Sequence, residues 1–192
     1  MENIKNWFSE QWKERKFRVL LMLTLLLILG LCVEFYYFKY SVLKGIRYLG
    51  LVAVLFIIAW IDSKEKRIPN KILLAMLLGR VVLLLVECIL YKEYWMTLLM
   101  SSAMGFLLAG GMFLLCYILT RGGIGAGDVK LFAVLGMYLG GSAIFSVIFL
   151  TVVFAAVFNL INLLRKKTDL KQEIPFAPFV FLGTVAGIFL GL

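Results

Sequence analysis

Two aspartates are the residues of this chain best suited to catalysis. Asp62 follows the apolar run 57–61, and Asp128 follows the glycine-rich stretch 122–127. The sequence has one other aspartate, Asp169, and no histidine, which excludes zinc proteases of the His-Glu-x-x-His type and nucleophiles activated by histidine. Two neighbouring carboxylates can share one proton, so that one takes a proton from water while the other protonates a carbonyl oxygen. The pair could therefore act as an aspartyl peptidase does.

A structural alternative stays open at this point. Asp62 could simply end a helix in headgroup water, and Asp128 could be the N-cap of a helix that begins at Val129.

The glycine-rich turn beside Asp128 offers an open backbone. Its glycines permit positive φ and the close approach of another chain, so the turn could hydrogen-bond an extended peptide. Lys130, two residues after Asp128, could tune that carboxylate electrostatically. A phosphate cradle is the other interpretation, although the turn lacks the Gly-Lys-Ser/Thr ending of a nucleotide loop. The glycines concerned are Gly122, Gly123, Gly125 and Gly127.

Two proline-containing stretches accompany the aspartates. Residues 67–70, Arg-Ile-Pro-Asn, follow Asp62 and open a helical segment, in which Pro69 suits a first turn and Asn70 a cap. Residues 174–179, Ile-Pro-Phe-Ala-Pro-Phe, open the last segment in the same manner. Each stretch is also explained by helix-start chemistry alone.

The composition indicates an integral membrane protein. The 192 residues are 63% hydrophobic and 16% charged, with a mean hydropathy of +1.00, whereas soluble domains average about 45–50% apolar and about 25% charged. We predict an all-α, polytopic bundle of about seven transmembrane helices, or six if residues 129–164 form one unit kinked at Gly140 and Gly141. The predicted segments are 19–38, 44–61, 71–91, 95–119, 129–140, 142–164 and 176–192.

Residues 19–192 are predicted to form a single membrane domain after a basic, amphipathic tail of residues 1–18. The first apolar segment is too long for a signal sequence of about 7–15 apolar residues, so we interpret it as an uncleaved membrane helix. Three isolated cysteines, Cys32, Cys88 and Cys116, form no Cys-x-x-Cys pair, so neither a metal site nor a cofactor is predicted.

Charge distribution predicts the orientation. Two long segments separate Asp62 from Asp128, so both must lie on one side of the membrane. With the N-terminus in the cytoplasm, 15 of the 20 Lys and Arg residues fall in cytoplasmic segments, and Arg80 lies within a helix. The four outer cations are Lys39, Lys44, Arg47 and Lys92. This pattern puts both aspartates on the cytoplasmic face, and the net charge of +9 does not form a nucleic-acid-binding stripe.

Three charged residues fall inside apolar segments. Arg80 and Glu87 are seven residues apart on one helical face, and Glu34 lies in the first segment. We predict that Arg80 and Glu87 form a structural salt bridge facing the bundle interior. A small transporter or channel using all three charges is the alternative function. A third is an acyl or phosphoryl transferase using the glycine turn.

Taken together, the motifs resemble the type IV prepilin peptidase family, whose members are membrane aspartyl peptidases with a Gly-x-Gly-Asp motif. The matching stretches are residues 62–70, 125–131 and 174–179, and the resemblance covers about residues 45–192. It implies that Asp62 and Asp128 are the catalytic pair. It assigns these residues to the active-site loops and substrate binding: Gly125, Gly127, Lys130, Arg67, Pro69, Asn70 and Pro175.

The resemblance also implies a substrate and a location. Leader peptides of prepilins or pseudopilins would be cleaved after a glycine, at the cytoplasmic face of a bacterial cytoplasmic membrane. Recognition would rest on the apolar pilin helix packing between membrane helices, with Glu65 or Glu173 as partners for leader cations. Many members carry a zinc-binding insertion with paired cysteines that is linked to N-methylation. This chain lacks such a segment, so we expect peptidase activity and not methyltransferase activity. Ala177 replaces a glycine common in the third motif.

Overall fold

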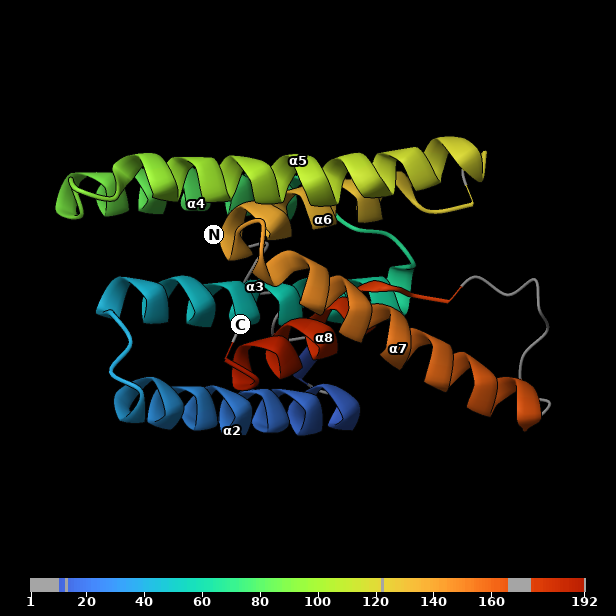
Figure 1. Ribbon diagram of the computed structural model, residues 1–192. Helices are drawn as coiled ribbons and strands as arrows, with labels where there is room; N and C mark the ends of the chain where they lie inside the picture. Colours follow the sequence, from blue (N-terminus) through green and yellow to red (C-terminus); the bar gives the residue numbers. More distant parts are fainter. Residues whose placement is uncertain (1–10, 13, 122, 166–173, 192) are drawn as a thin grey trace. The chain divides into compact units, whose positions relative to one another are not determined.

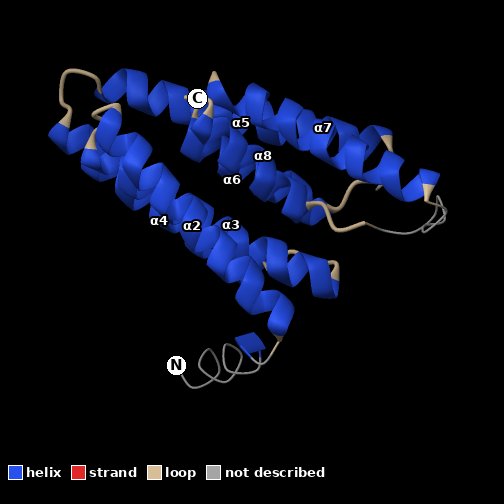
Figure 2. Ribbon diagram, turned by 90° about the horizontal axis from the view of Figure 1, so that it is seen from below, coloured by secondary structure: helices blue, strands red, loops and turns tan. Residues whose placement is uncertain are grey.

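The chain folds into helices joined by short connections. The computed structural model describes residues 11–12, 14–121, 123–165 and 174–191, and no strand occurs among them (Figure 2). They belong to two units, Met1–Tyr40 and Ser41–Leu192. The described part of the first unit contains the helix α2 (Arg15–Tyr37). These features confirm the predicted all-α class; most of the predicted tail lies outside the described residues.

The second unit contains six helices along its described residues, so with α2 the predicted number of seven is confirmed there. They are α3 (Val42–Glu65), α4 (Asn70–Leu90), α5 (Trp95–Leu119), α6 (Ala126–Leu139), α7 (Ala143–Leu164) and α8 (Ala177–Phe189).

Five of the seven helices, namely α2, α3, α4, α5 and α7, are long and apolar enough to cross a membrane. The predicted polytopic helical bundle is thus confirmed, with five helices of spanning length and two shorter ones. α6 has 14 residues and α8 has 13, which corresponds to about 21 Å and 20 Å at 1.5 Å per residue. A hydrocarbon core of about 30 Å is longer than either.

Local sequence explains where α3 begins and ends. The Ser41 side chain accepts a hydrogen bond from the backbone N–H of Lys44, which starts the helix before that residue. At the other end Lys66 adopts the left-handed conformation, with φ of 50°, and Pro69 follows. Lys44 and Arg47, which were counted among the outer cations, therefore lie inside α3, as the predicted segment 44–61 has them.

A glycine turn separates α6 from α7. Gly140 has φ of +85°, which L side chains rarely adopt, and the N–H of Gly141 donates to the carbonyl of Ser101 on α5. Of the two possibilities predicted for this pair, the structure has a tight turn rather than a kink. α6 also approaches α5 very closely, since a Cβ at Gly105 would lie 2.8 Å from the backbone carbonyl carbon of Gly136.

Packing within the second unit brings separate parts of the chain to one end. α5 packs along α6, α7 along α8, and α3 along α8, while α4 contacts α3, α5 and α6. Figure 1 shows the connection 66–69, residues 120–121 and 123–125, and the segment 174–176 at the same side of this unit, on the right of the view. The three motifs found in the sequence therefore lie at one end of the helices.

Candidate active site

Asp62 is held by the start of another helix. It lies in the last turn of α3 with 5% of its surface exposed. The backbone N–H of Ala177, the first residue of α8, donates to Asp62 Oδ2 over 2.9 Å, and the Phe176 backbone also hydrogen-bonds the carboxylate. The first N–H groups of a helix lack partners within the helix and favour an anion. The third motif thus provides backbone donors for the first aspartate, and no sequence pattern had assigned Ala177 that role.

Asp128 lies in the first turn of α6. The N-cap of this helix is Gly125, so the alternative in which Asp128 is the cap of a helix starting at Val129 is wrong. The Gly125 backbone hydrogen-bonds the Asp128 carboxylate, an arrangement similar to the capping box. A Cβ at Gly125 would lie 3.0 Å from Asp128 Oδ2, and therefore a side chain there would crowd the carboxylate.

The two carboxylates interact electrostatically. Burial, followed by the negative charge of Asp62, raises the pKa of Asp128 from 3.8 to about 6, and the hydrogen bond from Gly125 opposes this shift. An effect of one carboxylate on the pKa of another requires that they be near each other. The structure therefore places both aspartates at the same end of the helices, as their separation by two long segments predicts.

The first and second motifs are in direct contact. A Cβ at Gly127 would lie 3.1 Å from Cβ of Ile68, so the glycine permits the 66–69 connection to lie against α6. Lys130 Nζ donates to Asn70 Oδ1 over 3.0 Å. Asn70 is the first residue of α4 and makes no side-chain cap, so its predicted capping role is wrong. Its side chain instead joins α4 to α6.

The glycines of the turn serve close approach rather than unusual backbone geometry. Among the described residues, the glycines with positive φ are Gly140 and Gly191. The positive φ that the sequence suggested for the turn is therefore absent at Gly123, Gly125 and Gly127, and Gly122 lies outside the described residues.

The other predicted site residues lie at the margin. Arg67 Nε bonds Glu65 Oε2 over 2.6 Å in an exposed ion pair, which occupies the glutamate suggested as a partner for leader cations. Pro69 and Pro175 are half-buried beside the starts of α4 and α8. Glu173 lies outside the described residues.

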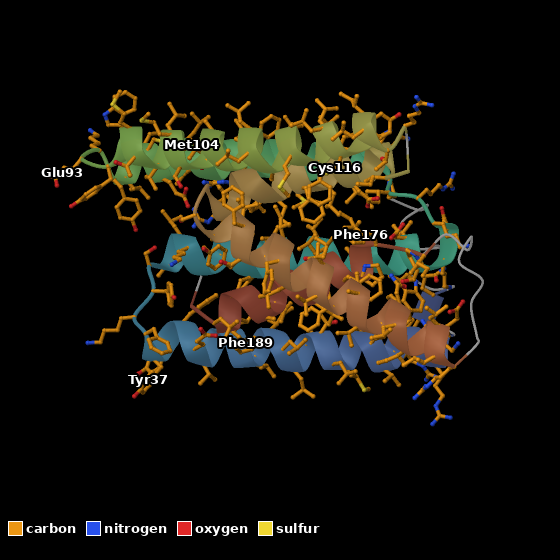
Figure 3. All side chains as sticks on the ribbon, turned by 45° about the vertical axis from the view of Figure 1, so that its right-hand side comes forward. Tyr37, Glu93, Met104, Cys116, Phe176 and Phe189 are labelled. Atoms are coloured by element: carbon orange, nitrogen blue, oxygen red, sulfur yellow. The ribbon has the colours of Figure 1, made fainter. Side chains whose placement is uncertain are left out.

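An aromatic cluster joins the helix that carries Asp128 to the segment that donates to Asp62. Phe132, one turn after Asp128 on α6, stacks on Phe113 of α5 with ring centroids 3.8 Å apart. Phe176, which immediately precedes Ala177, lies 6.0 Å from the Phe132 ring and 6.5 Å from the Phe113 ring (Figure 3). Phe176 belongs to the third sequence motif, whereas no sequence pattern had indicated a role for Phe113 or Phe132. The spacing of four residues from Asp128 to Phe132 could have identified one of them.

The charges inside the bundle are paired with each other. Arg80 Nη1 bonds Glu87 Oε2 over 2.8 Å, which confirms the predicted buried salt bridge. Arg47, which was counted among the outer cations, also bonds Glu87, over 3.1 Å. The transporter alternative also used Glu34, which belongs to α2 in the other unit.

Comparisons with known proteins agree with these motifs. The model of the type IV leader peptidase family matches residues 49–160, more than half of the chain. The prepilin leader peptidase/N-methyltransferase of Bacillus subtilis (strain 168) is 30% identical over 140 residues, which cover 73% of this chain and 54% of that protein. The protein of the same name from Burkholderia pseudomallei (strain 1026b) is 32% identical over 150 residues, covering 74% of this chain and 45% of that protein.

The chain thus spans about half the length of the curated relatives it matches. No solved structure matches it. Because the family model covers 49–160, which runs from within α3 into α7 and includes both aspartates, the chain belongs to the type IV leader peptidase family.

Proposed function

We propose that this protein is a membrane aspartyl endopeptidase that removes the leader peptide of prepilins or pseudopilins. The observation that carries this proposal is the electrostatic coupling of Asp62 and Asp128, two carboxylates from distant parts of the chain. Family membership and the names of the relatives supply the substrate class. Cleavage after a glycine, at the cytoplasmic face of a bacterial cytoplasmic membrane, follows from the resemblance and from the distribution of Lys and Arg.

The two carboxylates would take different roles. Burial disfavours the ionised form of Asp62, and the backbone N–H of Ala177 opposes this effect. Asp128, with a pKa raised to about 6 by burial and by the charge of Asp62, retains its proton more readily. Asp62 would accept a proton from water as the water oxygen attacks the scissile carbonyl carbon. Asp128 would give its proton to the carbonyl oxygen, forming a neutral tetrahedral intermediate. As the C–N bond breaks, Asp62 would give the proton it took from water to the leaving amine nitrogen, and a hydroxyl of the intermediate would return a proton to Asp128 as the new carboxyl group forms.

The surrounding groups support this division of roles. The aromatic cluster of Phe113, Phe132 and Phe176 would give the site an apolar lining, which would favour a shared proton over two charges. The Gly125–Gly127 turn would present its backbone to the extended leader, and the apolar pilin helix would pack between membrane helices. The loops that receive the leader would be shaped by five further residues, namely Lys130, Arg67, Pro69, Asn70 and Pro175.

The direct test uses the full chain reconstituted in liposomes with a prepilin that the Bacillus subtilis relative cleaves. Asp62→Asn and Asp128→Asn should each lower the cleavage rate by at least about 10²–10⁴-fold, the range that general acid–base catalysis contributes. Glu93→Gln, the same carboxylate-to-amide change on an exposed residue of the α4–α5 turn (Figure 3), should leave the rate unchanged. Normal cleavage by either aspartate variant would refute the two-carboxylate mechanism.

A further inference from the structure

Arg80 is a buried charge that the proposed reaction does not use. It lies in the middle of α4 with 1% of its surface exposed. Its guanidinium makes three hydrogen bonds to three helices. Nη1 donates to Glu87 Oε2 on α4 over 2.8 Å, Nη2 to Ser102 Oγ on α5 over 2.8 Å, and Nε to the backbone oxygen of Met137 on α6 over 2.9 Å.

The bond to Met137 caps the C-terminal end of α6. This helix ends at Leu139, so the Met137 carbonyl is among the last four, which lack partners within a helix. α6 is also too short to reach across a bilayer, and an unpaired carbonyl in apolar surroundings is unfavourable. A cation at this end of a helix also complements its dipole. Arg80 therefore gives the Met137 carbonyl a hydrogen-bond donor at a place where we expect no water to supply one.

A second contact anchors the same turn of α6. The hydroxyl of Tyr138 donates to the backbone oxygen of Met76 on α4 over 2.9 Å, and the Arg80 guanidinium lies 5.9 Å from the Tyr138 ring centre. Glu87 compensates the charge of Arg80, and Arg47 adds a further bond to the same carboxylate. The end of α6 is thus fixed to α4 by two side chains that form direct hydrogen bonds.

We propose that Arg80 is a positioning residue. It fixes the C-terminal end of α6 and thereby the position of Asp128 along the axis of that helix relative to Asp62. This inference rests on the proposed peptidase function. Met137 and Asp128 are nine residues apart on one continuous helix, or about 14 Å along its axis. A helix transmits an axial shift from one end to the other, and a misplacement of about 1 Å in a catalytic group can cost about 10²-fold in rate.

Arg80→Lys tests the proposal, because lysine keeps a positive charge for Glu87 but cannot reproduce the three-way fork of the guanidinium. We expect kcat to fall by about 10²-fold with little change in KM, since the substrate surface is untouched. Displacement of α6 should also expose Asp128 and separate it from Asp62. The alkaline limb of the kcat/KM profile should therefore move to lower pH, a shift that mere loss of stability would not produce.

Three further variants distinguish an effect on the position of α6 from an effect on the stability of the folded protein. Tyr138→Phe removes the second anchor of the same turn and should change kcat and the pH profile in the same direction by a smaller amount. Ser102→Ala removes one bond of Arg80 but leaves the bond to Met137, so it should lower Tm while kcat stays within about twofold. Thr151→Val is the matched control, because Thr151 Oγ1 is buried and has no hydrogen-bond partner within the described chain. It should leave both kcat and the profile unchanged.

The outcomes are distinguishable from a failure of the proposed function. If the wild-type protein does not cleave the prepilin, the peptidase assignment fails. If it cleaves, and folded Arg80→Lys has the wild-type kcat and pH profile, the positioning role is overturned while the peptidase assignment stands. If Arg80→Lys does not accumulate as folded protein, Tyr138→Phe decides, and wild-type behaviour of that variant overturns the positioning role.

Discussion

At the scale of single residues, the two aspartates differ in their surroundings. Burial acts on both carboxyl groups, but at Asp62 backbone hydrogen bonds from the start of α8 oppose it. At Asp128 the charge of Asp62 adds to burial, and together they raise the pKa to about 6. Two like groups with different environments are the usual basis for separate acid and base roles. The backbone donors of Asp62 come from the chain 115 residues later, which no local pattern can reveal.

The raised pKa predicts the pH dependence of cleavage. Below a pH of about 6 Asp128 holds the proton that the mechanism needs, and above it the protonated fraction falls about tenfold per pH unit. We therefore expect kcat/KM of the free enzyme to decline with rising pH from about 6, with a slope of one proton. Initial cleavage rates at low substrate concentration, measured in liposomes across about pH 5–8, would test this. A constant rate across that range would contradict the assignment of Asp128 as the acid.

A second prediction at this scale concerns Gly125. A Cβ at this position would lie 3.0 Å from Asp128 Oδ2, so Gly125→Ala should displace the carboxylate and lower kcat by about 10-fold or more. Its φ of −63° suits alanine, so the helix start itself is not strained. Gly50→Ala, on α3 with nothing within 4 Å of the added carbon, is the control. Equal activity of the two variants would show that the carboxylate tolerates the added methyl group.

At the scale of elements, α6 depends on its contact with α5. Gly105 and Gly136 face each other so closely that the atoms met by an added Cβ belong to the backbone, which cannot move aside as a side chain can. Small residues that permit such backbone contact are characteristic of helix pairs in membranes. Phe113 and Phe132 stack across the same pair of helices near the aspartates. The short α6 is thus positioned by close packing along its length and by Arg80 at its end.

Two glycine-to-alanine substitutions on α5 should distinguish the effect of its packing against α6 from the effect of helix propensity. Gly105→Ala should lower the free energy of unfolding by at least about 1–3 kcal/mol, because the helices must move apart. Gly111→Ala, on the same helix with open space around the added carbon, should be neutral or stabilising by about 0.5–1 kcal/mol. Thermal unfolding of the purified protein in detergent would measure both. Similar Tm values for the two variants would refute the close contact.

At the scale of the whole molecule, the connections determine which residues can meet. α4 and α5 both have the length to cross a membrane, so the connections before α4 and after α5 lie on the same side. The α4–α5 turn, which contains Glu93, lies at the opposite end of these two helices (Figure 3). Arrangement of the Lys and Arg residues predicts that the aspartate end faces the cytoplasm.

Labelling of single cysteines would test this orientation. In a variant without the three native cysteines, Glu93→Cys should react with a membrane-impermeant maleimide in intact cells. Lys66→Cys and Arg121→Cys, both exposed at the aspartate end, should react only after the cells are opened. If both Lys66→Cys and Arg121→Cys reacted in intact cells, the aspartate end would face outward and the proposed orientation would be wrong. If only one of them reacted, the two connections could not lie on the same side of the membrane.

The relatives' names supply a further prediction for the whole protein, since they include N-methyltransferase. The sequence predicts cleavage without methyl transfer for these 192 residues, whose three cysteines are isolated from one another. Mass spectrometry of the mature pilin after cleavage in the presence of S-adenosylmethionine would test this. A product one methyl group heavier than the cleaved chain would contradict the expectation.

The sequence by itself determined the membrane class, the two aspartates and their shared side, because hydropathy and the number of intervening segments are local properties that can be counted along the chain. It also predicted the Arg80–Glu87 pair, since both residues lie on one face of one helix. Tertiary structure alone decided that Ala177 donates to Asp62, that Asn70 binds Lys130 instead of capping α4, and that Arg47 joins Glu87. These contacts join residues from 40 to 115 positions apart, and their formation depends on how whole helices pack.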